Sequence, residues 1–441
     1  MRTPLYFLIY NILIVPMLIL FSHVAALFNR KVRQGLIGRY TILREFYRRD
    51  LPKILASGHP RVLIHCASMG EFEHIKPVIA LLKARLPEVE IVVMFFSPSG
   101  FENVRQAEGV RTFIYAPFEF FPSVFRLFKT LRPGLFIIAK HDVWPNQLWS
   151  AVLLRIPVFL INASLGKKSR RARIPFRWFH QTIYQYFAKI LAISEADGTN
   201  FRLLAAEKKV VVVGDTKFDQ VIRRSEESRQ KKLLPPEITK DRTIFVAGST
   251  WPEDEAQLIP ALKVLQAQVP QFLTIICPHE PTPEHLSGLE RKLLPLQSIR
   301  LSQLKNYRNE PVIVVDSIGV LANLYSHAHV AFVGGSFKGS IHNVLEPAVY
   351  GIPVLFGPHF ENSHEAIQLK NLGGAFVVQN ADQLQERLLQ LLTRQEYRQQ
   401  VGEVARRFVE HHRGATERVV AWILRYLKPS NVQQVHQSIS Q

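Results

Sequence analysis

Cysteine is scarce in this sequence, and a paired-carboxylate metal motif is absent from the predicted strand ends. Only two of the 441 residues are cysteine, Cys66 and Cys277, and both lie inside apolar runs. Two buried thiols exclude a disulfide scaffold or a cysteine-based metal cluster, and they fit a reducing compartment. The nearest approach to an Asp-x-Asp pair, Glu195-Ala196-Asp197, is predicted to begin a helix instead. We therefore expect no bound metal and no cofactor.

Acidic residues are also in short supply. The chain has 36 Asp and Glu against 55 Lys and Arg, which gives a formal net charge of +19. Such an excess indicates an acidic partner, which the charge alone leaves open as nucleic acid, an anionic membrane or an anionic substrate. The length is too great for a single ordinary core, so two domains are expected.

Charged residues are missing altogether from Thr3 to Asn29, where the sequence is strongly apolar. About 20 apolar residues suffice for a helix that crosses a bilayer. A cleaved signal peptide is the alternative, but no small-residue cleavage site precedes the arginines that begin at Arg30. Those arginines favour retention of the following chain in the cytoplasm. The segment is therefore predicted to be a membrane anchor that either spans the bilayer or lies in its interface.

Beyond the anchor, short apolar runs alternate with longer amphipathic stretches. Continuous apolar strands that alternate with helices are typical of a parallel sheet covered on both faces. A polar, proline-containing stretch interrupts the pattern once and reads as a linker. The prediction is an α/β protein with an anchor (1–29), a Rossmann-like domain (30–222), a linker (223–242), a second Rossmann-like domain (243–425) and a tail (426–441).

Two segments share the form of a buried strand, a glycine turn and a polar group at the start of a helix. The first is Ala67–Glu71, after the run Val62–Cys66, and the second runs from Gly334 to Glu346, after Val330–Val333. Helix starts carry unpaired N–H groups and a positive dipole end, so both segments suit an anion or a reacting polar group. Sites in two halves of one chain favour an enzyme whose domains face each other across a cleft.

The order of six short motifs resembles the family of 3-deoxy-D-manno-octulosonic acid (Kdo) transferases. The motifs are Ser68-x-Gly70-Glu71, Ser97-Pro98-Ser99-Gly100, Trp144-Pro145-Asn146, Gly214–Asp219, Gly334-Gly335-Ser336, and His342-Asn343 with Glu346. The resemblance implies a GT-B glycosyltransferase that moves Kdo, with inversion, from CMP-Kdo to the lipid A precursor of lipopolysaccharide. It also implies a place on the cytoplasmic face of the cell inner membrane, with membrane lipids as partners and no nucleic acid.

Glu71 is the candidate catalytic residue. Inversion needs a base that takes the proton of the acceptor hydroxyl, and a glutamate after a strand and Gly70 is well presented for this. From the residues alone, a favourable interaction with the helix dipole is an equal alternative. The resemblance implies the base, with Ser68, Gly70, Asp142 and Trp144 on the acceptor side.

The second glycine segment is the candidate donor site. In most proteins a Gly-Gly-Ser segment is only a turn. Lys217, taken alone, would be interpreted as a solvated surface charge. Ser249 and Thr250 could equally serve as caps of the following helix. The resemblance implies CMP binding, with Glu346 on the ribose and Ser336 and Asn343 near the phosphate. The donor-side set is Lys217, Ser249, Thr250, Pro278, His279, Gly334, Gly335, Ser336, Asn343 and Glu346.

Two positions depart from the family pattern. Lys140-His141-Asp142 stands where many members have Glu-Thr-Glu, so one carboxylate is shortened and another becomes a cation. Pro278-His279-Glu280-Pro281 stands where Pro-Arg-His-Pro is common, so a phosphate-binding arginine is missing. Histidine lacks the bidentate fork of arginine, and weaker donor binding or a local rearrangement is expected.

A second basic cluster interrupts the first domain and is interleaved with Phe176 and Trp178. A solvated surface is the plain interpretation, but cations beside aromatic rings also match a lipid that carries phosphates and acyl chains. We interpret it as an acceptor and membrane patch that comprises Lys167, Lys168, Arg170, Arg171 and Arg173.

Two further functions remain open from the sequence. One is another GT-B sugar-nucleotide enzyme, such as a lipid-linked N-acetylglucosaminyltransferase or a sugar-nucleotide epimerase. The other is a non-enzymatic, membrane-tethered protein that binds polyanions by charge alone, with salt-sensitive, sequence-blind association.

Overall fold

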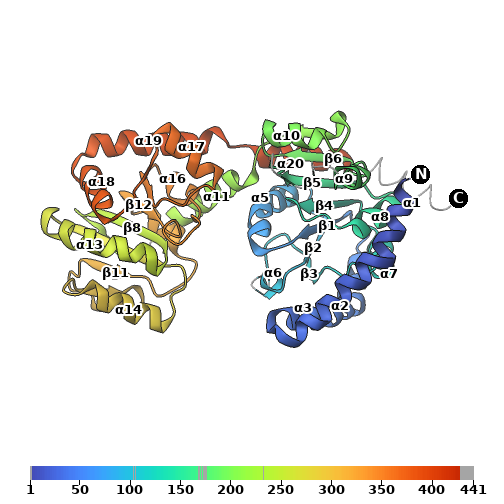
Figure 1. The fold of residues 1–441 in the computed structure, drawn as a ribbon, viewed down its shortest axis with the longest axis horizontal. Helices are drawn as coiled ribbons and strands as arrows, with labels where there is room; N and C mark the ends of the chain where they lie inside the picture. The colour runs from blue at the N-terminus through green and yellow to red at the C-terminus, as the bar shows by residue number, and fades with distance from the viewer. Residues whose placement is uncertain are drawn as a thin grey trace. The chain divides into compact units, whose positions relative to one another are not determined.

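The chain folds into two compact units, each built on its own parallel sheet (Figure 1). The computed structural model describes residues 2–102, 104, 106–166, 169, 171, 176–231 and 233–427. The first unit comprises Met1–Gln220 and Gly414–Gln441, and the second comprises Val221–Arg413. This confirms the two predicted Rossmann-like domains.

The first unit has a seven-stranded sheet in the order β3-β2-β1-β4-β5-β6-β7. All its strand pairs are parallel, and the interior strand β4 is buried at every residue, as continuous apolar runs predict. The order reverses between β1 and β4, so this pair marks the topological switch point, where ligands bind in open α/β sheets. The strands are β1 (Arg61–Cys66), β2 (Glu90–Phe95), β3 (Thr112–Tyr115), β4 (Leu135–Ala139), β5 (Val158–Ala163), β6 (Lys189–Ala192) and β7 (Val210–Val212).

Helices cover both faces of this sheet, and the two faces carry separate apolar clusters. The helices are α1 (Arg2–Ile9), η1 (Tyr10–Ile14), α2 (Val15–Phe28), α3 (Arg30–Glu45), η2 (Phe46–Asp50), α4 (Leu51–Ala56), α5 (Met69–Arg85), α6 (Pro98–Glu102), α7 (Phe121–Leu131), α8 (Pro145–Leu153), α9 (Phe176–Tyr184), α10 (Glu195–Arg202), η4 (Glu207–Lys209) and α20 (Ala415–Leu427).

The second unit repeats the architecture, with the strand order β10-β11-β9-β8-β12-β13-β14 and parallel pairing throughout. Its switch point lies between β8 and β12. The short strand β10 was not predicted. The strands are β8 (Thr243–Thr250), β9 (Phe272–Pro278), β10 (Ser298–Arg300), β11 (Val312–Val314), β12 (Val330–Val333), β13 (Val354–Phe356) and β14 (Ala375–Val377).

The helices of the second unit again lie on both faces of its sheet. They are α12 (Pro236–Thr239), α13 (Pro252–Gln268), α14 (Pro283–Leu293), η5 (Leu301–Asn306), α15 (Leu321–Tyr325), α16 (Leu345–Ala348), α17 (His364–Leu372), α18 (Ala381–Thr393) and α19 (Gln395–His411).

The unit boundaries differ from those predicted. Residues 223–229, predicted as linker, continue the helix α11 (Thr216–Arg229), which runs from the first unit into the second. The final helix α20, predicted to close the second domain at residue 425, belongs to the first unit. Its apolar residues Val419 and Ile423 are buried in the cluster formed by α5 and β1. Asp219 holds its first turn by accepting hydrogen bonds from the N–H groups of Gly414 and Thr416, both at 2.7 Å.

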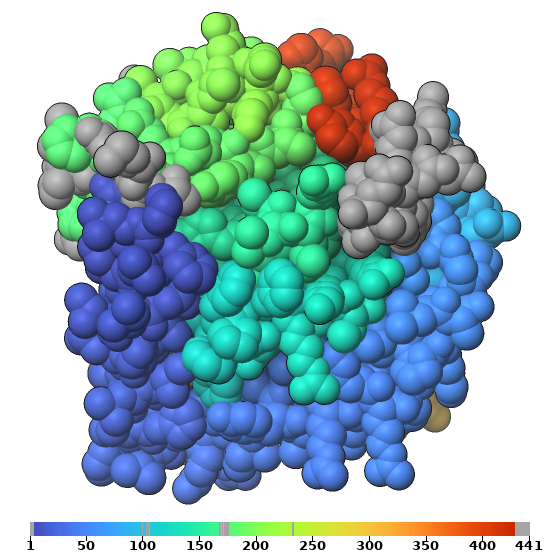
Figure 2. All heavy atoms as spheres, turned by 90° about the vertical axis from the view of Figure 1, so that its right-hand side faces the viewer, coloured from blue at the N-terminus to red at the C-terminus, as the bar shows by residue number. Residues whose placement is uncertain are grey.

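The apolar N-terminal segment forms one long helix whose docked side lies against the first unit. Pro4–Phe28 is long and apolar enough to cross a membrane, a test that core helices and signal sequences also pass. Phe7 packs edge-on against Phe121 of α7 and Trp149 of α8. The side chains of Asn11 and Asn146 exchange hydrogen bonds at 3.0 and 2.9 Å. Figure 2 shows these first residues, in dark blue, alongside the blue-green residues of α7 and α8.

The opposite side of the same helix is apolar and exposed. Such a stripe on a soluble protein marks an interaction surface, and its apolar character suits a membrane. The exposed residues are Leu5, Leu8, Ile9, Ile12, Leu13, Ile14, Met17, Leu18, Leu20, Phe21, Val24, Leu27 and Phe28.

Candidate functional site

Glu71 lies where the chain leaves β1 and enters α5, at the switch point of the first sheet. Ser68 caps α5, and its hydroxyl accepts a hydrogen bond from the Glu71 N–H at 3.4 Å. The Glu71 carboxylate in turn accepts a hydrogen bond from the Ala67 N–H at 2.6 Å. Only 8% of Glu71 is exposed. Burial raises the pKa of this carboxyl group above its usual value, and the Ala67 hydrogen bond opposes the rise. A carboxylate with a raised pKa suits a general base.

A second carboxylate, Asp142, adjoins this site because β4 pairs directly with β1. The Nε2 atom of His65, a residue of β1 with no exposed surface, lies 2.8 Å from Asp142 Oδ2. Trp144 donates its indole N–H to the same oxygen at 3.0 Å. The structure thus brings Asp142 and Trp144, two predicted acceptor-side residues, together with Glu71.

The two carboxyl groups have opposite pKa shifts. Burial raises the pKa of Asp142, but the hydrogen bonds and charge of His65 and the Trp144 hydrogen bond outweigh burial, so the net shift is downward. The negative charge of Asp142 adds to the upward shift of the Glu71 pKa. Two neighbouring acids with pKa values driven apart are a common basis for acid–base roles. Here Glu71 is the group that takes and holds a proton more readily.

The Gly214–Asp219 motif joins β7 to α11 and is held by polar contacts within the first unit. Asn162 has a left-handed backbone, with φ of +50°, and its side chain donates to the Thr216 hydroxyl at 2.7 Å. Lys217, predicted on the donor side, forms an ion pair with Asp215 at 3.3 Å. The ordered motif therefore positions Lys217 within the first unit, whereas the other donor-side residues belong to the second.

The predicted basic patch falls mostly outside the described residues, which include Arg171 but not Lys167, Lys168, Arg170 or Arg173. Arg171 donates to the Tyr184 hydroxyl at 3.4 Å. Nearby in the sequence, Phe176 and Trp178 are each about half exposed on α9, at 55% and 49%.

In the second unit, the loops after β9, β8 and β12 lie side by side because these strands are neighbours in the sheet. The His279 N–H donates to the Thr250 carbonyl, and the Gly334 N–H donates to the Gly248 carbonyl, both at 2.9 Å. A Cβ atom at Gly334 would lie 2.3 Å from the Ser249 carbonyl oxygen, so only glycine permits this approach. Pro278, at the end of β9, is buried beside them. Most of the predicted donor-side residues are thus brought together.

Two of the three N–H groups of the Gly-Gly-Ser turn, those of Gly334 and Gly335, already have acceptors within the chain. The fully buried carboxylate of Asp254 accepts hydrogen bonds from the N–H groups of Gly335, Phe337 and Trp251, at 2.7, 3.1 and 2.9 Å. Asp254 could not be predicted from the sequence as a partner of this turn, because a carboxylate in the first turn of a helix is expected at any helix start.

The hydroxyl groups predicted for this site are also engaged within the chain. Ser336 is fully buried, and its hydroxyl accepts a hydrogen bond from the Gly357 N–H at 2.6 Å. The Thr250 hydroxyl donates to Glu255 at 2.9 Å, and Glu255 in turn contacts His285. Ser336 and Thr250 therefore shape the loops, and a phosphate would reach their hydroxyls only by displacing these partners.

Glu346 lies on the short helix α16 and contacts Arg224 of α11, whose Nη1 atom is 3.3 Å from Glu346 Oε1. The Asn343 side chain accepts a hydrogen bond from the Leu345 N–H at 3.1 Å and so holds the start of that helix. Arg224 is a cation beside the predicted ribose residue that no local pattern predicts, since Arg224 lies 122 positions away in the sequence.

The loop that lacks the family arginine carries stacked rings. The ring of His279 stacks on that of His342 at 4.3 Å, and the Trp251 indole N–H lies 3.0 Å from His342 Nε2. Burial and the nearby His279 and Lys338 lower the pKa of His342 to about 4, so this ring is neutral near pH 7. The Lys338 ammonium lies 3.0 Å from the Trp251 ring centre. This exposed lysine therefore places a cation over the indole ring that packs against His279.

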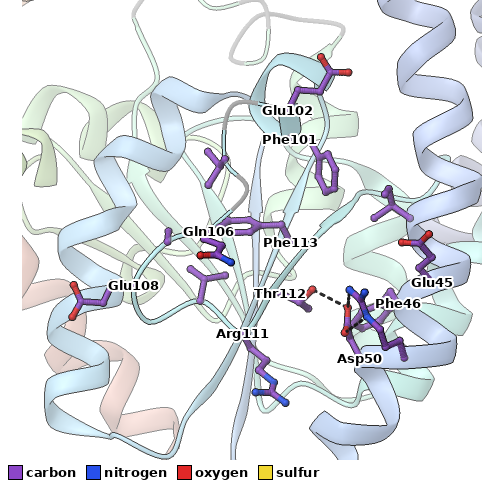
Figure 3. Close-up of a pocket in the computed structure, with 15 residues that line it drawn as sticks. Glu45, Phe46, Asp50, Phe101, Glu102, Gln106, Glu108, Arg111, Thr112 and Phe113 are labelled. Carbon is purple, nitrogen blue, oxygen red and sulfur yellow. Dashed lines mark hydrogen bonds and ion pairs between the residues drawn. The ribbon is translucent and has the colours of Figure 1, made fainter. Parts of the chain in front are cut away.

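A cavity of about 870 Å³ opens elsewhere in the first unit, beside the edge strand β3 (Figure 3). Its lining mixes acids and bases, and Asp50 bonds both Arg49 and the Thr112 hydroxyl there. Among the predicted site residues that the structure describes, none lines this cavity. Its size therefore does not make it the functional site.

The fold and the positions of these sites define a class of proteins, the two-unit GT-B type. The UDP-GlcNAc 2-epimerase from Neisseria meningitidis shares the fold, with a TM-score of 0.59 at 16% identity over 83% of this chain and 100% of that one. A glycosyltransferase from Rickettsia africae has a TM-score of 0.54 at 13% identity, over 84% of this chain and 99% of that one. At such low identity the likeness concerns the fold alone.

The family follows from sequence comparisons. Residues 39–220 match the family model described as 3-deoxy-D-manno-octulosonic-acid transferase (kdotransferase). The chain is 29% identical to a 3-deoxy-D-manno-octulosonic acid transferase of Haemophilus influenzae over 83% of this chain and 87% of the relative. A protein of the same name from Bordetella pertussis is 27% identical, over 81% of this chain and 86% of that relative. The chain is thus similar to Kdo transferases, a family of glycosyltransferases, and this similarity indicates an enzyme.

Proposed function

We propose that this enzyme transfers Kdo from CMP-Kdo to the lipid A precursor, a tetra-acylated disaccharide bisphosphate, with inversion at the sugar. The observation that supports it most is the buried Glu71 at the switch point, with a raised pKa and with the Asp142–His65 pair beside it. The similarity to Kdo transferases supports the sugar, and the net charge of +19 fits a donor and an acceptor that both carry phosphate.

In the proposed reaction, Glu71 takes the proton of the acceptor hydroxyl. The acceptor oxygen forms a bond to the anomeric carbon of Kdo, and the bond from that carbon to the phosphate oxygen of CMP breaks on the opposite face. The bonding electrons leave with CMP as added negative charge. Asp142, held by His65 and Trp144, stays ionised and keeps the Glu71 pKa high.

The donor is proposed to bind in the second unit, with Glu346 accepting hydrogen bonds from the ribose and Arg224 orienting that carboxylate. Because Asp254 occupies the N–H groups of Gly335 and Phe337, we assign the phosphate to exposed cations beside the turn, with Lys338 foremost. The scheme uses these cations and needs no metal.

We also propose that the protein sits at the cytoplasmic face of the inner membrane. One side of the N-terminal helix is held on the first unit: Phe7 packs against Trp149, and Ala26, near the other end of the helix, is buried. A helix held in this way would suit an interfacial position better than a perpendicular span, because its docked residues stay with the folded unit. Deletion of residues 1–28 should release much of the protein from membranes, and undiminished membrane association would contradict this part.

Incubation of the purified protein with CMP-Kdo and the tetra-acylated precursor, followed by mass spectrometry of the lipid, tests the proposed function. A product heavier by one or more Kdo residues is expected. The absence of such a product, together with turnover of a UDP-sugar, would favour the other sugar-nucleotide enzymes that share the fold.

A further inference from the structure

An apolar cavity of about 320 Å³ lies between the N-terminal helices and the edge of the first sheet. It is at the lower end of the roughly 300–1,000 Å³ typical of ligand pockets. Its walls come from α2 and α3 and from the chain that follows β2, β3 and β4. Phe21 lines the cavity while 73% exposed, so the cavity reaches the exposed apolar side of α2.

The cavity contains a buried cation. Arg39 is only 8% exposed, and its guanidinium donates to the carbonyls of Phe96 and Gly35 at 2.6 and 2.9 Å. It also lies against the rings of Phe96 and Phe118, at 5.0 and 5.6 Å. In the part of the chain that the structure describes, no carboxylate lies within ion-pair distance of Arg39. A buried guanidinium without an acid beside it favours an anionic ligand group.

The acid that lines the same cavity does not cancel this charge. Burial raises the pKa of Glu119 to about 8, with a further rise from the charge of Asp142, and the Asn146 N–H opposes this shift. Glu119 is therefore mostly protonated near pH 7. An apolar wall with one uncompensated cation matches an anionic amphiphile better than a neutral hydrocarbon.

The cavity shares a wall with the site around Glu71. The Ser97 N–H donates to the Ala67 carbonyl at 3.1 Å, and the Ala67 N–H donates to Glu71 at 2.6 Å. Trp144 lines the cavity with its ring and donates its N–H to Asp142. A chain that enters from the apolar side of α2 therefore ends next to the reacting groups.

We propose that this cavity receives one acyl chain of the anionic acceptor lipid, with Arg39 as the cation for the acceptor's anionic group. The inference rests on the proposed function, since it names how the acceptor is held. Seating one chain would draw the sugar headgroup out of the membrane toward Glu71 and fix its position for transfer.

Filling the cavity tests this inference. Ala25 lines it from α2, and Ala25→Phe would occupy the space; Ser22→Phe, at a second lining position, serves as an independent variant. Val24→Phe, at a neighbouring position that is 47% exposed, is the matched control. Each variant is compared with the wild type on the tetra-acylated acceptor and on the same disaccharide bisphosphate without acyl chains. Thermal melting checks that all of them fold.

The filled variants should lower kcat/KM for the acylated acceptor at least tenfold and leave the deacylated acceptor unchanged, while Val24→Phe changes neither. Equal rates for filled and control variants, or equal losses on both acceptors, would overturn the inference. If the wild type transfers Kdo to neither acceptor, the proposed function fails first, and a binding measurement then decides about the cavity.

That measurement uses 12-bromododecanoic acid, whose bromine quenches nearby tryptophan fluorescence. Trp144 should be quenched in the wild type and in Val24→Phe but not in Ala25→Phe, and Trp144→Phe identifies the signal. Release of the probe by the acylated acceptor supports the inference. Release by phosphatidylglycerol but not by that acceptor would assign the cavity to a bulk lipid and overturn it, as would the absence of quenching.

Discussion

The two units place a buried acid at the same local position but give it different hydrogen-bond partners. In both, the first strand of the sheet leads into a helix whose third residue is a buried acid: Glu71 after β1 and Asp254 after β8. Glu71 accepts one hydrogen bond from a backbone N–H, whereas Asp254 accepts three. The Glu71 carboxylate therefore keeps lone pairs that can accept a proton, whereas the Asp254 carboxylate holds the glycine turn against its sheet. A shared strand-to-helix pattern therefore does not tell a reacting acid from a structural one; their hydrogen-bond partners do.

The largest expected effect is on Glu71. Glu71→Gln keeps the shape and can still accept the Ala67 hydrogen bond, but it cannot take a proton, so kcat should fall by about 10²–10⁴. CMP affinity, measured by calorimetry, should not change. Full activity in this variant would show that Glu71, like Asp254, has a structural role.

The matching change in the second unit should affect stability instead. Asp254→Ala leaves three N–H groups without their acceptor, and we expect the free energy of unfolding of this unit to fall by about 2–4 kcal/mol. Denaturant unfolding monitored by fluorescence measures it. Glu71→Ala is the comparison, because Glu71 gives up one such bond; a larger loss there than at Asp254 would reverse our assignment.

A smaller effect is expected at the donor-side carboxylate. Glu346→Ala should weaken CMP binding about tenfold with little change in kcat at saturating donor, because it removes the proposed ribose acceptor. Arg224→Ala should produce a weaker loss in the same direction. Calorimetric titration with CMP gives both values, and an unchanged affinity in Glu346→Ala would exclude the ribose role.

The smallest effect concerns pH. Glu71 must be ionised to act as a base, so activity should rise with pH through its raised pKa. Asp142 contributes to that rise, so Asp142→Asn should lower the Glu71 pKa and move the acidic limb of the kcat/KM profile to lower pH. A limb that stays in place, or moves upward, would mean that the two carboxyl groups are not coupled.

Much of the fold was predictable because parallel strands buried on both faces must be apolar throughout. The runs Val62–Cys66 and Val330–Val333, predicted as buried strands, form β1 and β12 with boundaries that agree to within one residue. The domain boundaries were not predictable in the same way. Helix α20 follows the second unit in sequence but packs on the first, because its apolar side is buried beside α5. The sequence pattern of an amphipathic helix predicts its apolar side but not the element against which that side packs.

The amino-acid sequence by itself determined which segments are strands, where the glycine turns fall, and that Glu71 follows β1 at the start of a helix. These are local properties, set by side-chain period, backbone freedom and helix capping. The tertiary structure alone decided that His65 and Trp144 hold Asp142, that Asp254 fills the glycine turn, and that Arg39 lines an apolar cavity. Each of these depends on contacts between residues from different elements, and burial, hydrogen bonding and charge then set the chemistry of a group through its neighbours in space.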